Sequence, residues 1–321
     1  MIDLNFGENY QKEILLKKKI EEELAKKLDV QKDFVMLNYG SNSNLILFFS
    51  AFSNKCLKEK KRPLKVLLDY PNYFFTINQL KEWDIQPISI KRDRNMNFPI
   101  KEFTSSINKA DVILLTTPNN PTGKPISDKD IIQIIQKTPK ETIVLIDRSC
   151  INTLPEISTK EIIHRFNKKI VILHSFSKSH NLSDERIGYL VTNNKEIAKF
   201  LFNKRDLNHN IHAVERCLEA INNRKIVEMN KKRIKDCNNL LNKFFKNNKD
   251  FIYLQSSSNF ALISLPNGLD SKIVEENLKK KGILVMGGHK LGLGNRYIRV
   301  HMTGIKEITK FLNELVKIPR N

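Results

Sequence analysis

Four side chains in one short stretch could do chemistry on a carbonyl compound that carries a phosphate. Lys178 closely follows the apolar run Val171–His174 and is preceded by Ser175 and Ser177, and Arg186 comes eight residues after it. A lysine is costly to bury, so one at the end of a buried strand usually has a function. Its amine forms Schiff bases with carbonyl groups, while hydroxyls and a guanidinium bind phosphate. Taken alone, the pattern is weak, because most lysines in a lysine-rich chain lie in solvent.

Two apolar runs upstream also end in polar groups. The run Val112–Leu115 leads into a proline-bracketed turn that holds Asn120, and the run Ile143–Asp147 ends in a carboxylate. Ordinary turns use Pro, Asn and Gly as well, and an aspartate there could cap a helix or a turn. In an open α/β sheet, however, the carboxyl ends of the strands line the ligand crevice. We therefore expect Asn120, Asp147 and Lys178 at one edge of one sheet.

The remaining pattern supplies the elements that must position these residues. Continuous apolar runs alternate with helical patterns, as in a parallel sheet buried on both faces. We expect an amphipathic helix over residues 11 to 27, a helix capped by Ser127, long basic helices from about 210 to 246, and a helix from about Ser271. The strands expected in the first part are Val35–Leu37, Val66–Asp69, Val112–Leu115, Ile143–Asp147, Val171–His174 and Ile187–Val191, and those in the second part are Phe251–Leu254, Phe260–Leu265, Ile283–Met286 and Tyr297–His301.

Length and composition limit the classes of protein to consider. A chain of 321 residues with 40% hydrophobic and 28% charged residues has room for one large domain and a smaller one. It contains no apolar run of membrane-spanning length, and its first residues lack the features of a signal peptide. The histidines show no metal-ligand spacing. The four cysteines, Cys56, Cys150, Cys217 and Cys237, form no Cys-x-x-Cys pair. We therefore expect neither a disulfide framework nor a structural zinc site, and we expect a protein of the reducing cytoplasm.

The net charge of +20 raises the question of a nucleic-acid partner. Lysine is spread over the whole chain, and runs such as Lys17–Lys19 and Lys279–Lys281 fall on the polar faces of amphipathic helices. Aromatic residues are not interleaved with these runs. We interpret the charge as a solvated surface and expect neither a nucleic-acid nor a membrane partner.

The order of these motifs resembles that of fold-type-I pyridoxal-phosphate (PLP) enzymes of the class I/II aminotransferase family. The shared order is Asn-Pro-Thr-Gly from Asn120, the strand-end Asp147, and Ser-x-Ser-Lys ending at Lys178 with Arg186 eight residues on. Within the family the chain most resembles the branch of histidinol-phosphate aminotransferases and threonine-phosphate decarboxylases. The resemblance runs nearly end to end, with further matches at Ile2–Asn5, Asn38–Leu45, Tyr70–Tyr73, Ser258–Phe260 and Tyr297–Val300.

The resemblance implies an architecture and an assembly. Residues 31–210 would form a large PLP-binding α/β domain, whose mostly parallel, seven-stranded sheet is flanked by helices. Residues 1–30 and 211–321 would together form a smaller α/β domain. The family builds its sites at the interface of a homodimer, and Tyr10 matches a tyrosine that reaches the partner's phosphate site.

The resemblance also implies a role for each site residue. Lys178 would bind the cofactor as a Schiff base and then move protons, and Asp147 would keep the pyridine nitrogen protonated. Asn120 would donate to the ring 3-oxygen, and Tyr73 would stack on the ring, unless it is an ordinary core tyrosine. The cofactor phosphate would be bound by Ser175, Ser177, Arg186 and the backbone N–H groups of Ser41 and Asn42. The substrate would be bound by Asn5 and by Arg299, unless Arg299 is an ordinary edge-strand arginine.

Three positions depart from the family pattern. Cys150 replaces a tyrosine that hydrogen-bonds the 3-oxygen, and a thiol is a poor substitute donor. Arg148 stands where a glutamate often follows the strand aspartate. Where members with phosphorylated substrates carry an arginine, this chain has Met286, which leaves Arg148, Arg296 and His289 as candidate phosphate ligands. The departures favour a specialised pathway enzyme over housekeeping histidine biosynthesis.

Three functions are compatible with this site. The first is amino transfer between an amino acid and a keto acid or related carbonyl compound in a biosynthetic pathway. The second uses the same residues as a decarboxylase or lyase of an amino acid or amino-acid phosphate. The choice depends on which bond is held perpendicular to the cofactor ring. The third is a binding or regulatory protein with degraded catalysis, which the retention of Lys178, Asp147, Asn120, Arg186 and Arg299 opposes.

Overall fold

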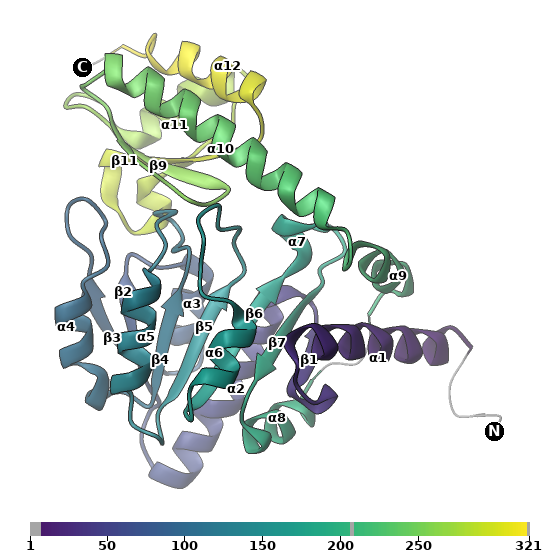
Figure 1. The fold of residues 1–321 in the computed structure, drawn as a ribbon. Helices are drawn as coiled ribbons and strands as arrows, with labels where there is room; N and C mark the ends of the chain where they lie inside the picture. The colour runs from purple at the N-terminus through teal and green to yellow at the C-terminus, as the bar shows by residue number, and fades with distance from the viewer. Residues whose placement is uncertain (1–7, 206–208, 320–321) are drawn as a thin grey trace.

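Two β-sheets of different size organise the chain (Figure 1). The computed structural model describes residues 8–205 and 209–319. The larger sheet has seven strands and is covered by helices on both faces, and the smaller sheet has four antiparallel strands. The expected fold class, an α/β protein with a mostly parallel seven-stranded sheet and a second, smaller unit, is confirmed.

The larger sheet has the strand order β1-β7-β6-β5-β4-β2-β3. Neighbours from β6 to β3 run parallel, whereas β7 runs antiparallel to both β6 and β1. The central strands β4 and β5 are buried over their whole length, because helices cover both faces onto which their side chains alternate. The strands are β1 (Val35–Asn38), β2 (Lys65–Tyr70), β3 (Gln86–Lys91), β4 (Val112–Thr116), β5 (Ile143–Arg148), β6 (Lys169–Ser175) and β7 (Gly188–Thr192).

The edge strand β3 is the one strand of this sheet that the sequence does not predict. Gln86, Pro87 and Lys91 are exposed, and only Ile88 and Ile90 pack against the core. Proline is tolerated on an edge strand, but it weakens the sequence signal for one. The other six strands are confirmed, with ends that differ from the expected ones by one or two residues.

Two apolar cores lie on opposite faces of the larger sheet. One contains side chains of α2, α3 and α8, and the other contains side chains of α1, α4, α5, α6 and α9. In neither described range does a helix combine the length and the hydropathy that crossing a bilayer requires. The helices around this sheet are α1 (Glu8–Leu28), α2 (Gly40–Lys60), α3 (Phe74–Glu82), α4 (Ile100–Ser105), α5 (Asp128–Lys137, capped by Ser127), α6 (Thr159–Arg165), α7 (Phe176–Ser179), α8 (Lys195–Phe202) and α9 (Ile211–Ala220).

Helix α1 packs on the larger sheet, whereas the resemblance placed residues 1–30 in the smaller domain. Its buried residues Ile20 and Leu24 belong to the core of the larger sheet, and Val214 and Cys217 of α9 join the same core. The two helices cover one another's apolar faces and lie beside β1, away from the smaller sheet (Figure 1). We therefore propose a domain boundary between α9 and α10, with the described part of residues 1–30 in the larger unit.

The smaller unit is a sheet covered by three helices on one side (Figure 1). Its strand order is β10-β11-β9-β8, and its core includes the buried residues Ile263, Ile298 and Phe311. The long helix α10 spans from the larger unit to this sheet. The elements are α10 (Arg224–Asn247), β8 (Ile252–Leu254), β9 (Phe260–Ser264), α11 (Ser271–Lys280), β10 (Met286–Gly287), β11 (Tyr297–His301) and α12 (Ile305–Leu315).

The expected strand Ile283–Met286 is wrong for most of its length. The N–H of Ile283 donates to the carbonyl of Leu278 at 2.9 Å, and Gly282 has φ of +70°. This glycine-terminated pattern ends helix α11. The apolar residues after it complete the helix cap, and Leu284 is 82% exposed. Only Met286 enters the two-residue strand β10.

A buried ion pair fixes the turn that follows β4. Asp69 at the end of β2 accepts a hydrogen bond from Nε of Arg92 at 2.6 Å, and both side chains are fully buried. The same carboxylate accepts a bond from Nδ2 of Asn119 at 2.9 Å. Asn119 is the neighbour of Asn120, so the ion pair holds the turn that presents Asn120.

Arg92→Met should destabilise the protein by about 3–5 kcal/mol, because Asp69 is left buried without its cation. Urea denaturation would measure the loss as a lower midpoint with an unchanged slope. Arg94→Met, at an exposed position two residues away, serves as the control. Its free energy of unfolding should stay within about 0.5 kcal/mol of the parent value. Equal midpoints for Arg92→Met and the parent would contradict the role of the pair.

Candidate active site

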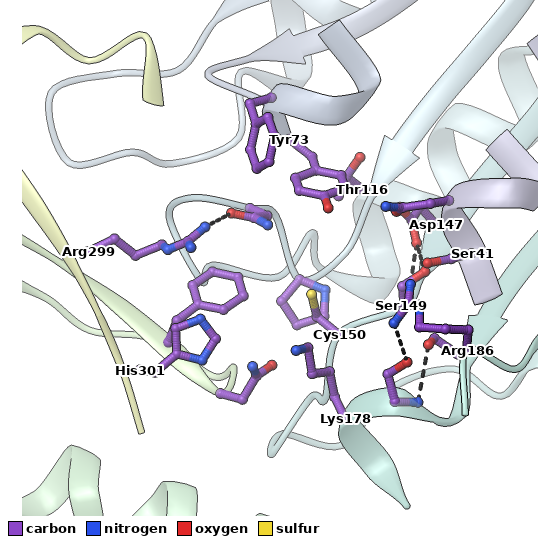
Figure 2. Close-up of a pocket in the computed structure, with 18 residues that line it drawn as sticks. Ser41, Tyr73, Thr116, Asp147, Ser149, Cys150, Lys178, Arg186, Arg299 and His301 are labelled. Carbon is purple, nitrogen blue, oxygen red and sulfur yellow. Dashed lines mark hydrogen bonds between the residues drawn. The ribbon is translucent and has the colours of Figure 1, made fainter. Parts of the chain in front are cut away.

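A cavity of about 200 Å³ opens where the central strands of the larger sheet end and β9 and β11 approach (Figure 2). Its lining comes from both units and from segments distant in sequence. Nearly all of the predicted site residues line it: Ser41, Asn42, Tyr73, Asn120, Asp147, Cys150, Ser175, Ser177, Lys178, Arg186 and Arg299.

Lys178 is held on the short helix α7, directly after β6. Ser175 caps this helix, since its hydroxyl accepts a hydrogen bond from the N–H of Ser177 at 3.2 Å. The buried Asn230 of α10 donates to the carbonyl of Ser179 at 3.0 Å and to that of Lys178 at 3.4 Å. The backbone on either side of the amine is therefore fixed, and Figure 2 shows Lys178 pointing into the cavity toward Cys150.

Asp147 is a buried carboxylate at the end of β5. Its side chain accepts hydrogen bonds from the N–H of Ser149 at 2.9 Å and from the Ser149 hydroxyl. Burial raises the pKa of Asp147, and the two Ser149 bonds oppose that rise. Within the described residues it has no ion-pair partner. A positively charged N–H group in the cavity would supply the missing partner.

The part of the cavity at the start of helix α2 has the features of an anion site. Helix α2 begins at Gly40, whose φ is +66°. The backbone N–H groups of Ser41 and Asn42 are in its first turn, where the helix dipole is positive. Arg186 donates through Nη1 to the Ser177 hydroxyl at 3.4 Å. A Cβ atom on Gly40 would lie 3.4 Å from Nη2 of Arg186, so the glycine lets the guanidinium approach the helix terminus.

Two neutral side chains form another wall. Burial and, to a smaller extent, the nearby Asp147 raise the pKa of the Cys150 thiol to about 12. Burial also raises the pKa of Tyr73, whose hydroxyl hydrogen-bonds the side chain of Asn42. At neutral pH, therefore, a thiol and a phenol face the cavity rather than a thiolate and a phenolate.

Arg299 connects the two units across the cavity. It lies on β11, is 8% exposed, and donates through Nη1 to Oδ1 of Asn120 at 2.8 Å. Its guanidinium lies 5.3 Å from the ring centroid of Phe260. Burial lowers the pKa of Arg299, but an arginine stays charged at neutral pH. Its Nε has no hydrogen-bond partner among the described residues, so this cation retains capacity for a ligand anion.

The residues considered as ligands for a phosphate on the substrate, Arg148, Arg296 and His289, lie outside the cavity lining. Arg148 is buried, and its one hydrogen bond goes to the Thr159 hydroxyl at 3.4 Å. Arg296 donates to Oδ1 of Asn267, and His289 pairs with the Ser271 hydroxyl. Asn5 and the expected opening strand Ile2–Asn5 lie outside the described residues. Tyr10 falls in the first turn of α1, and its side chain is likewise outside the described part.

Several residues of this region were not predicted as part of the site, and three of them are polar groups that matter for its chemistry or for its support. Ser149 bonds Asp147, Asn230 holds the Lys178 backbone, and His301 lines the cavity. A serine two residues after an aspartate is a common local hydrogen-bond pattern, so Ser149 carried a usable signal. His301 stands two residues after Arg299 on one strand, which puts both on the same face. Asn230 lies within a basic helix and carried no signal.

Comparison with known proteins identifies related chains. A family model described as "Aminotransferase class I and II" matches residues 9–315. A histidinol-phosphate aminotransferase of Francisella philomiragia is 30% identical over 181 residues, which are 56% of this chain and 49% of that protein, about half its length. One of Caldicellulosiruptor saccharolyticus is 27% identical over 300 residues, which are 91% of this chain and 80% of that protein.

The chain shares its fold with a solved structure that is also described as a histidinol-phosphate aminotransferase. The histidinol-phosphate aminotransferase of Clostridium acetobutylicum superposes with a TM-score of 0.84 at 21% identity, covering 95% of this chain and 89% of that one. Together with the family match, this confirms the resemblance drawn from the sequence motifs.

Proposed function

The chain belongs to the aminotransferase class I and II family, and on that premise we propose that it is a PLP-dependent aminotransferase. It moves an amino group between an amino acid and a keto acid or related carbonyl compound in a biosynthetic pathway. One observation carries the proposal: a single cavity joins the amine of Lys178, the buried carboxylate of Asp147 and the guanidinium of Arg299.

The cofactor of this family is pyridoxal 5′-phosphate, and the residues present fit it. Asp147, buried without a cation among the described residues, suits a pyridine N–H⁺, and Ser149 orients its carboxylate and opposes the rise in its pKa. The terminus of α2 with Ser177 and Arg186 suits the phosphate. When bound, the cofactor supplies an aldehyde and a ring that accepts electrons from the substrate carbon.

The remaining residues orient the cofactor and the substrate. Asn120 would donate to the ring 3-oxygen, with Cys150 as a weak additional donor. Tyr73 would cover one face of the ring. Lys178 would hold the cofactor aldehyde through its amine and would carry protons at Nζ. Arg299 clamps the substrate carboxylate, where a guanidinium offers charge-assisted, bidentate hydrogen bonds.

The activity is tested with purified protein loaded with the cofactor. We expect a yellow protein whose absorbance shifts when an amino-acid donor is added, and one keto acid released per donor consumed. Release of carbon dioxide in its place would identify a decarboxylase, and no reaction with any donor would refute both. Lys178→Ala should abolish turnover. Lys279→Ala, at an exposed position on α11, should not.

Asp147→Asn should keep the cofactor bound but reduce turnover roughly 100-fold, as expected when a group aimed at developing charge is lost. The neutral amide cannot stabilise the protonated ring, whereas Ser177 and Arg186 still hold the phosphate. Absorbance measures cofactor retention and keto-acid release measures the rate. Near-normal turnover with bound cofactor would assign this role to another group.

We also propose a homodimer whose subunits complete one another's sites, located in the cytoplasm. Phe74 lines the cavity and is 42% exposed, which leaves an apolar wall beside the mouth. The N-terminal part of α1 projects past the β1 edge of the sheet (Figure 1), and Leu15 on it is 65% exposed. All four cysteines are free thiols, as a reducing compartment maintains.

Light scattering of dilute, cofactor-loaded protein should give twice the chain mass. A shared site requires a stable, two-fold interface, because an open pocket would let water weaken each charged contact there. Leu15→Lys should shift the protein toward monomers and lower cofactor occupancy in parallel. A fully active monomer with bound cofactor would refute the shared site and the role of Tyr10.

A further inference from the structure

The cavity offers few cations to a substrate. Among the described residues that line it, the lysine and arginine side chains are Lys178, Arg186 and Arg299. The proposed function uses each of them: Lys178 for the cofactor aldehyde, Arg186 for its phosphate, and Arg299 for the substrate carboxylate. No lysine or arginine of the described lining remains to bind a second, phosphorylated end of a substrate.

The groups that could replace such a cation are engaged elsewhere. The side chain of Arg148 is buried beside Thr159, and Arg296 binds Oδ1 of Asn267 at 2.8 Å. His289 lies 3.2 Å from the Ser271 hydroxyl. None of the three is part of the cavity lining. A phosphate dianion on the substrate would therefore lose its hydration without gaining a charged partner from the described residues.

One side chain of the lining has no task in the proposed function. His301 lies on β11 two residues after Arg299, so both project from the same face of the strand toward the cavity (Figure 2). Its ring packs against Phe260 with a centroid separation of 6.0 Å, which fixes its place. Among the described residues neither ring nitrogen has a hydrogen-bond partner.

The chemistry of this imidazole limits what it can bind. His301 is an exposed residue at the end of β11, but the groups packed around its ring partly desolvate the imidazole and, together with the nearby Arg299 and Lys178, lower its pKa to about 4. Since the charged form exists only below that pH, the ring is neutral near pH 7. A neutral imidazole offers one donor and one acceptor. That pair suits an alcohol, an amide or another neutral ring, and it supplies no charge to a phosphate.

We propose that His301 is a specificity-determining residue that hydrogen-bonds a polar, unphosphorylated side chain of the substrate. This inference rests on the proposed function, because it assumes that Arg299 holds the substrate carboxylate and Lys178 holds the cofactor. It distinguishes this chain from enzymes whose substrate carries both a carboxylate and a phosphate.

The first test compares matched compounds with and without a phosphate. Cofactor-loaded dimeric protein is given serine and O-phosphoserine, threonine and O-phosphothreonine, and homoserine and O-phosphohomoserine, which all carry a carboxylate for Arg299, and kcat/KM is measured for each. We expect the unphosphorylated member of every reactive pair to be favoured by about 10-fold or more, the cost of an unmatched buried group. A phosphorylated compound that is the best substrate of the whole panel would overturn the inference.

The second test assigns the selectivity to His301. His301→Leu should lower kcat/KM about 10-fold for serine, homoserine, glutamine and histidine, the loss of one hydrogen bond with a buried partner left unpaired. It should leave alanine, 2-aminobutyrate and norvaline unchanged, and His301→Gln should restore part of the loss. His212→Leu, at a side chain 83% exposed on α9, is the matched control and should change none of these values.

The possible outcomes separate this inference from the proposed function. If no amino compound changes the absorbance of the parent protein, the proposed function fails first. If donors react but His301→Leu affects polar and apolar donors equally, the residue has only a structural role and the inference fails alone. The absorbance of bound cofactor, measured for every variant, shows that each one has folded.

Discussion

The site depends on one costly arrangement: a carboxylate that is buried at the end of a central strand and has no cationic partner among the described residues. The burial that raises the pKa of Asp147 also prevents water from shielding it. Its partners from the chain are the N–H and hydroxyl of Ser149, which are neutral donors. The protonated pyridine ring of the proposed cofactor would supply the charged partner that the described residues do not.

A second constraint joins the two units. The hydrogen bond from Arg299 to Asn120 links β11 of the smaller sheet to the turn after β4 of the larger one. That turn is held in place by the buried Asp69–Arg92 pair through Asn119. A substrate carboxylate at Arg299 would therefore bind a guanidinium whose position both units determine.

The sequence predicts the site better than it predicts the surroundings. Asp147, Lys178 and Asn120 could be placed because parallel strands end at one edge, and apolar runs locate those strands. The packing of α1 and α9 on the larger sheet could not be predicted, since an amphipathic face does not identify its partner. Ile283–Met286 was assigned to a strand because apolar residues after a glycine can equally cap a helix. His301 could have been predicted as a cavity residue, because side chains two residues apart on a strand lie on the same face and Arg299 was already assigned to the site.

Strand alternation also explains why the departures from the family pattern have unequal consequences. Asp147 and Arg148 are neighbours in β5, so their side chains leave opposite faces of the sheet. The guanidinium of Arg148 lies beside Thr159 on the far face. This cation therefore does not neutralise the Asp147 carboxylate, although the two residues are adjacent in the sequence. Cys150, in contrast, lines the cavity with a neutral thiol. Of these two substitutions, only Cys150 alters the contacts available to the cofactor ring.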